Sequence, residues 1–193
     1  MPGTLAGTPG HTEPTEGNPA VFAVLRTVFE KVLTSFVILL MASLAVIILM
    51  GVTYRKLGIP LVWYDEVASI MLAWLTYYGA ALAALKRAHI GFPGLVNTLR
   101  PHLRVAAVLF AEACIIGFFA ILTWVGWEVL VILEGDSMVS LPNVPTQLTQ
   151  SVIPIGGVLF ILAQLFSLPE VLAQARGGGI VDHEQKQLEE VLR

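Results

Sequence analysis

The chain has 193 residues, of which 56% are hydrophobic and only 13% are charged, and its mean hydropathy is +0.78. A water-soluble domain carries about 25% charged residues, so this chain has too little charge to cover a surface that faces water. Its net charge of -3 also provides no basic surface for nucleic acid. The composition therefore predicts an integral membrane protein embedded in the lipid bilayer.

The first twenty residues differ in composition from the rest. Residues 1–20 are rich in Gly, Pro, Thr and Glu and hold few large apolar side chains. Such a segment buries too little surface to offset the entropy lost on ordering, so we predict a disordered tail. We place a membrane domain over 21–170 and a second tail over 171–193.

Four apolar runs predict an all-α membrane protein with four spans. The first run, 32–54, holds no charged residue, and as a helix it would measure about 35 Å against a hydrocarbon core of about 30 Å. The other spans are predicted over 65–86, 105–131 and 146–168.

Local signals refine these helices. Asp65 is a candidate N-cap for the second span. Pro154, followed by two glycines, predicts a bend in the first third of the fourth span. Between spans two and three, apolar residues in 89–102 recur at helical spacing, which predicts a short helix lying at the membrane interface.

The basic residues predict the orientation. Only Arg55 and Lys56 fall on one side of the four spans, whereas every other Lys and Arg falls on the opposite side. The positive-inside rule then puts both termini in the cytoplasm. Aromatic residues of an interfacial belt fall near the predicted outer ends of the first three spans, namely Tyr54, Trp63, Tyr64, Trp124 and Trp127.

The residues that support enzyme chemistry are missing or misplaced. All four histidines lie outside the predicted spans, where they cannot supply the axial ligands of a membrane haem. No Cys or His cluster has zinc spacing, and no phosphate-binding loop is present. We therefore expect no enzyme activity, no cofactor and no metal site.

Glu112 is the most unusual side chain, because it lies about 12 Å inside the third span. An ionisable residue at that depth is a functional candidate by default. It is either a proton or ion carrier, or a carboxylate that reaches or pairs with a basic group at the cytoplasmic interface.

The second span carries further candidates. Trp74 and Tyr78 share one helix face, and their N–H and O–H groups require partners inside the membrane. They either pack against another helix or line a substrate route. Gly79, paired with Ala83, forms a small-residue motif that allows two helices to approach closely.

The start of the second span carries an acidic pair. We expect Arg55 to pair with Asp65, with Glu66 or with lipid phosphate. The same outer cluster could instead dock a partner outside the cytoplasm.

Several of these residues together resemble a known pattern. The stretch 54–90 resembles the small membrane subunit of tripartite ATP-independent periplasmic (TRAP) transporters, the DctQ-like family. The likeness in architecture extends over 32–168. The residues that carry the resemblance are Tyr54, Arg55, Pro60, Trp63, Asp65, Glu66, Trp74, Leu75, Tyr78, Gly79, Ala80, Ala81, Arg87, His89 and Ile90.

The resemblance implies a role beyond what the spacing of residues indicates. It implies a subunit of the bacterial inner membrane that braces a larger, multi-span permease subunit carrying the substrate and sodium sites. A soluble periplasmic solute-binding protein would deliver an organic acid, and the ion gradient would drive uptake. The candidate partner-interface or structural residues are Arg55, Trp63, Asp65, Glu66, Trp74, Tyr78, Gly79, Arg87, His89 and Glu112.

Two other functions remain open. The chain could be a self-contained small transporter or channel that uses Glu112 as its coupling carboxylate. It could also be a membrane adaptor or assembly factor with no role in transport.

Overall fold

The computed structural model describes residues 19–86 and 100–177. In this part of the chain the regular secondary structure is α-helical, as expected. The helices are α1 (Pro19–Lys56), α2 (Tyr64–Leu85), α4 (Pro101–Ile132), α5 (Thr146–Gln150) and α6 (Val152–Arg176).

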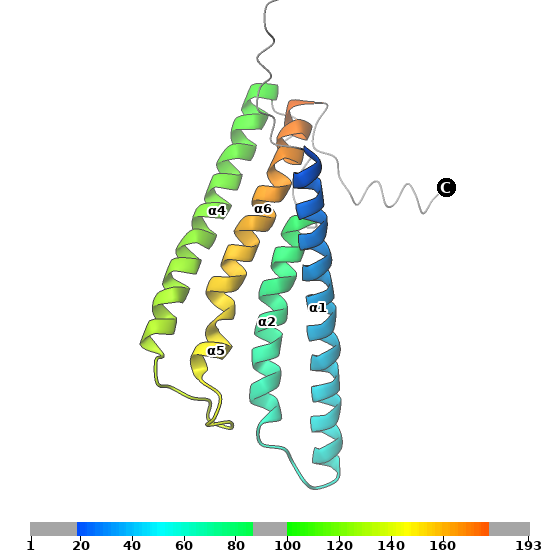
Figure 1. Cartoon of the computed structure of the whole chain (residues 1–193), viewed down its shortest axis with the longest axis vertical. Helices are drawn as coiled ribbons and strands as arrows, with labels where there is room; N and C mark the ends of the chain where they lie inside the picture. The colour runs from blue at the N-terminus through cyan, green and yellow to red at the C-terminus, as the bar shows by residue number, and fades with distance from the viewer. Residues whose placement is uncertain (1–18, 87–99, 178–193) are drawn as a thin grey trace, which may run out of the picture.

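The four long helices form one row rather than a closed bundle, in the order α4, α6, α2, α1 (Figure 1). The outer pairs α4–α6 and α2–α1 run antiparallel, whereas the central pair α6–α2 runs parallel, and α1 and α4 form the two edges. We call the end that holds residues 57–63 and 133–145 the loop end. The opposite end, where α1 begins and α6 finishes, is the terminal end.

Within residues 19–86 and 100–177, four stretches of helix are long and apolar enough to cross a bilayer, which agrees with the predicted four spans. Helices satisfy all their backbone polar groups internally, as a chain in hydrocarbon must. The first and last helices exceed the predicted spans. The first was predicted over 32–54, but α1 begins at Pro19, and the fourth was predicted to finish at 168, but α6 continues through Pro169 to Arg176.

The fourth span is interrupted close to Pro154, where the sequence predicted a bend. It is divided at Ser151 into α5 and α6, and Pro154 lies in the first turn of α6. Proline has no N–H with which to bond the carbonyl four residues earlier, so the helix is interrupted upstream of it. The helical hydrogen bonds resume with Ile155, whose N–H donates to the carbonyl of Ser151 at 3.2 Å.

The predicted interfacial helix over 89–102 falls mostly outside the described residues. Only the last residues of that segment are described, and Pro101 and His102 belong to the first turn of α4.

The core lies where α1, α2 and α6 meet. It is built mainly from Leu and Ala, and the residues buried in it include Leu33, Leu40, Tyr78, Ala81, Ala84, Leu85, Phe160 and Ala163. A smaller cluster near the terminal end joins Val108 of α4 to Val171 and Ala175 of α6.

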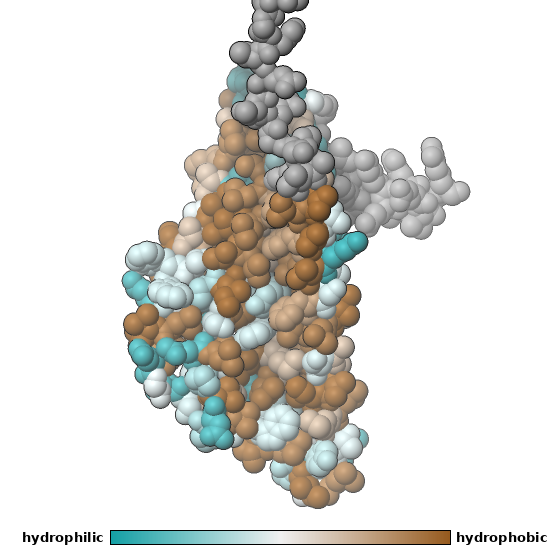
Figure 2. Space-filling view, in the orientation of Figure 1, coloured by the Kyte–Doolittle hydropathy of each residue, from teal (hydrophilic) through white to brown (hydrophobic). Residues whose placement is uncertain are grey.

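Both edge helices expose large apolar side chains. Figure 2 shows apolar residues over most of the visible face, with hydrophilic residues gathered toward the α4–α5 connection. In α1 the exposed residues include Leu39, Val46 and Leu49, and in α4 they include Phe110, Phe118 and Ile121. A surface this apolar is suited to lipid or to another membrane protein.

Candidate functional site

Glu66 joins the two connections at the loop end. Its carboxylate accepts hydrogen bonds from the backbone N–H groups of Val139 at 3.2 Å and Ser140 at 2.8 Å. The Ser140 hydroxyl in turn donates to the carbonyl of Val62 at 3.5 Å. The start of α2 therefore holds the α4–α5 connection against the α1–α2 connection.

Asp65, the acidic neighbour of Glu66, does not cap α2 as predicted. Helix α2 begins at Tyr64 with Trp63 as its N-cap, and the cap has no side-chain hydrogen bond. Asp65 lies in the first turn and is exposed. Its negative charge there still complements the positive end of the helix dipole.

Arg55 lies in the last turn of α1 and is exposed. Among the described residues it forms no ion pair with Asp65 or with Glu66, so that predicted pairing is not seen. Glu66 instead binds two backbone amides.

Trp74 bridges α2 and α5. Its indole N–H donates to the carbonyl oxygen of Thr149 at 2.9 Å. This carbonyl belongs to α5 and lies two residues before the break at Ser151. Trp74 therefore joins α2 to the short helix that precedes the break.

Tyr78 lies one turn after Trp74 along α2 and packs against it, with ring centroids 6.2 Å apart. Its ring also meets Phe36 of α1 edge to face, at 4.6 Å. Tyr78 is 9% exposed. Of the two interpretations of this aromatic pair, helix packing is the one that these contacts support.

Glu112 is 6% exposed and faces α6 from α4. Its carboxylate accepts a hydrogen bond from the side-chain amide of Gln164. One turn further along α6, the hydroxyl of Ser167 donates to the carbonyl of Gln164 at 3.0 Å. A buried polar cluster thus lies between α4 and α6 at the depth of Glu112.

Glycines mark the close contacts between neighbours in the row, but Gly79 is not among them. A methyl group added at Gly79 would have no atom within 4 Å. At Gly156 it would lie 2.8 Å from Cβ of Tyr77, and at Gly126 it would lie 2.7 Å from the Ile153 side chain. Gly157 meets Thr123 and Gly51 meets Tyr64 in the same manner.

At the terminal end, ion pairs join α1 to α6 and to the residue that follows α2. The guanidinium of Arg26 lies 3.1 Å from the Glu170 carboxylate, and the ammonium of Lys86 lies 3.4 Å from that of Glu30. These side chains are partly exposed, so each pair contributes about 0–1 kcal/mol.

Two candidates, Arg87 and His89, lie outside the described residues. Sequence reasoning missed Gln164, Thr149 and Ser140 as partners of the other candidates. For Gln164 a signal existed. Glu112 lies about a dozen residues, or about 17 Å, from the start of α4, and Gln164 lies about as far from the end of α6. Both of these helix ends are at the terminal end, so the two side chains are at the same depth.

The fold and these contacts define a multi-span helical membrane protein whose buried polar side chains hold helices and loops to one another. The family described as tripartite ATP-independent periplasmic transporters, DctQ component, matches residues 44–174. The chain belongs to this family, as its resemblance predicted, and is the small membrane component of a TRAP transporter rather than an enzyme. No curated protein matches the chain.

Proposed function

We propose that this chain is a scaffold subunit of a secondary, ion-gradient-driven uptake system. In this role it braces the large, multi-span permease subunit, which carries the solute and ion sites. It also helps to dock a soluble periplasmic binding protein that delivers an organic acid.

The observation that carries the proposal is the single row of helices. A layer one helix thick has two broad faces and two edges, and the described side chains that line them are largely apolar. The buried side chains of Glu112 and Gln164 bond each other across the α4–α6 interface. This arrangement suits a brace that lies against a larger membrane protein.

The charge distribution supports an orientation in the bacterial inner membrane with both termini in the cytoplasm. Of the described basic residues, all except Arg55 and Lys56 lie toward the terminal end. The positive-inside rule puts that end in the cytoplasm and the loop end in the periplasm.

The loop end has the features of a docking surface. Its two connections expose apolar side chains, with Val62 82% and Val139 92% exposed. The same end also exposes acidic residues, namely Asp65, Glu134 and Asp136. Exposed apolar and charged side chains together are typical of protein interfaces, and the Glu66 contacts hold the two connections to each other.

Affinity purification of the tagged chain from its native membranes tests the proposal. We expect a larger multi-span protein to copurify in a fixed ratio. Ala45→Trp on the exposed face of α1 and Ala113→Trp on that of α4 form a matched pair of variants, one for each edge. Loss of the partner in one of them identifies the bracing edge. Purification of the chain alone, or only with copies of itself, contradicts the proposal.

A further inference from the structure

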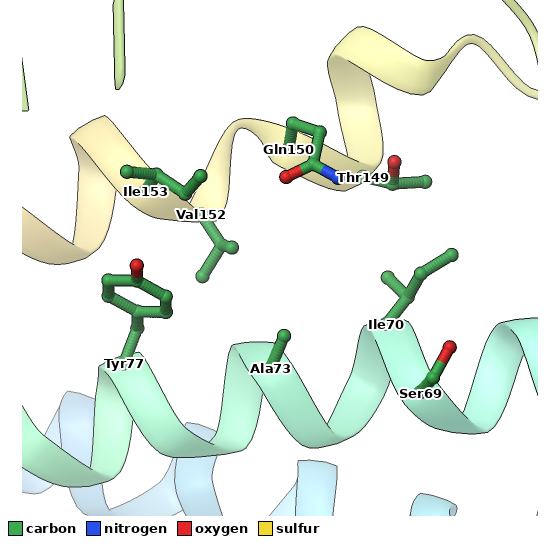
Figure 3. Close-up of a pocket in the computed structure, with 8 residues that line it drawn as sticks. All are labelled: Ser69, Ile70, Ala73, Tyr77, Thr149, Gln150, Val152 and Ile153. Carbon is green, nitrogen blue, oxygen red and sulfur yellow. The ribbon is translucent and has the colours of Figure 1, made fainter. Parts of the chain in front are cut away.

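A cavity of about 340 Å³ opens between α2 and the α5–α6 segment, on the loop-end half of the layer. In Figure 3, Ile70, Ala73 and Tyr77 project from α2 toward α5 and α6, and Val152 points back toward them. The remaining residues that line it are Ser69, Thr149, Gln150 and Ile153.

Two hydrogen-bond donors of this cavity have no partner in the described part of the chain. The hydroxyls of Ser69 and Thr149 already donate to the carbonyls of Glu66 and Thr146, both at 2.8 Å. The hydroxyl of Tyr77 and the amide of Gln150 make no such bond with any described residue.

An unpaired donor is costly at this depth. Ser69 lies about 8 Å along α2 from Tyr64, and Tyr77 lies about 12 Å further on, so the cavity begins near the hydrocarbon boundary and continues into the core. A hydroxyl or amide without a partner in an apolar medium costs about 2–7 kcal/mol. These two donors therefore require an acceptor from outside the chain.

The chemistry of the lining limits what the acceptor can be. None of the residues that line the cavity is charged. An anionic solute or a phosphate group would be desolvated here without a cation to compensate it. A neutral acceptor attached to an apolar chain fits both the donors and the walls formed by Ile70, Val152 and Ile153.

We propose that this cavity binds the ester region of one glycerophospholipid from the periplasmic leaflet. The ester carbonyls accept from the Gln150 amide and the Tyr77 hydroxyl, and the first methylenes of one acyl chain lie along the apolar wall. The headgroup lies toward the loop end of the cavity, near Ser69. The cavity is at the small end of the range for ligand pockets, which matches part of a lipid rather than a whole one.

Native mass spectrometry of the full-length chain, purified in mild detergent from membranes, measures the retained phospholipid. We expect one tightly held phospholipid per chain. Ala73→Phe fills the cavity and should lower its occupancy at least tenfold, whereas Ala120→Phe on the exposed face of α4 should leave it unchanged. Equal retention in both variants, or no retention in the unmodified chain, overturns the proposal.

A second comparison tests the hydrogen bonds and does not depend on the folding of Ala73→Phe. The double variant Tyr77→Phe with Gln150→Leu removes both donors without adding volume. It should lower retention of a diester phospholipid several-fold and make it equal to that of the corresponding diether lipid, which has no carbonyls. Equal retention of diester and diether lipids by the unmodified chain contradicts the proposal. Crosslinking in native membranes gives a further check. A protein, rather than a lipid, attached to the peptides that hold Tyr77 and Gln150 would also contradict the proposal. The test uses the chain without its partners, so it is independent of the proposed scaffold role.

Discussion

The carboxylate of Glu112 accepts a hydrogen bond from the side-chain amide of Gln164, across the interface between α4 and α6. The two side chains come from different spans at the same depth. This contact joins an edge helix of the layer to its neighbour through polar groups that lipid cannot satisfy.

This contact predicts energetic coupling between the two residues. Gln164→Leu removes one donor from the Glu112 carboxylate and should lower the free energy of unfolding by about 1–3 kcal/mol. The double variant with Glu112→Leu should cost less than the sum of the two single variants. The coupling should be about 0.5–2 kcal/mol, in the range of hydrogen bonds between membrane helices. Unfolding in mixed micelles measures this cycle, and strict additivity would show that the bond does not hold the helices together.

Glu112→Gln separates the scaffold role from that of a self-contained transporter. A Gln at this position can still accept a hydrogen bond from Gln164, but it cannot carry a proton or an ion charge. We expect solute uptake by cells to remain within about twofold of the unmodified protein, because in a scaffold Glu112 carries no proton or ion and the substitution keeps an acceptor for Gln164. Loss of uptake with the complex still assembled would favour Glu112 as the coupling carboxylate.

The Trp74–Thr149 bridge predicts different behaviour for two tryptophans. Trp74→Phe removes the donor to the backbone carbonyl of the buried Thr149 and should destabilise the fold by about 1–2 kcal/mol. Trp124→Phe is the matched control. The Trp124 indole donates at 3.0 Å to Glu128 on its own helix and is 70% exposed, so its loss should cost less than about 0.5 kcal/mol. Thermal unfolding in detergent compares the two, and equal losses contradict the bridge.

Glycine substitutions test the helix row itself. Gly156→Ala places a methyl group against Tyr77 and should destabilise by about 1–3 kcal/mol through overpacking. Gly79→Ala meets open space and should be neutral or stabilising by up to about 1 kcal/mol, because alanine favours helix. The same unfolding assay ranks the pair, and the reverse order would place the close α2–α6 contact elsewhere.

The sequence predicted where the membrane spans lie, but it did not predict which spans pack against each other. In lipid every backbone polar group must bond within the chain, so a long apolar run has to form a helix. The run 32–54 and the other apolar runs were therefore sufficient to locate the spans. Which helices touch depends on side-chain shape, and the predicted motif at Gly79 has no close neighbour, whereas Gly156 and Gly157 do.

Contacts between segments that are distant in the sequence could not be predicted either, because they depend on how the folded chain runs. Asp65 and Glu66 are adjacent acids in the first turn of the same helix. Only the path of the α4–α5 connection brings Ser140 to Glu66 and leaves Asp65 exposed. The break at Ser151 was anticipated as a bend, because Pro154 marks a weak point without determining how the chain adjusts there.

The Glu66 contacts predict a local effect at the loop end. Glu66→Gln leaves one acceptor oxygen where the carboxylate has two, so one of the N–H groups of Val139 and Ser140 loses its partner. Amide hydrogen exchange at these two positions should become faster. Asp65→Asn is the control, since Asp65 is exposed, and unchanged exchange in Glu66→Gln would contradict the role of this contact.

Uptake into proteoliposomes tests the central claim, that the chain is a scaffold which does not transport alone. The measurement compares vesicles that hold the chain alone, the large permease alone, or both, with an inward sodium gradient. The solute-binding protein is added outside, loaded with a carboxylate that it is first shown to bind. We expect gradient-driven uptake only in vesicles that hold both membrane subunits. Sodium-driven uptake by the chain alone would contradict the account.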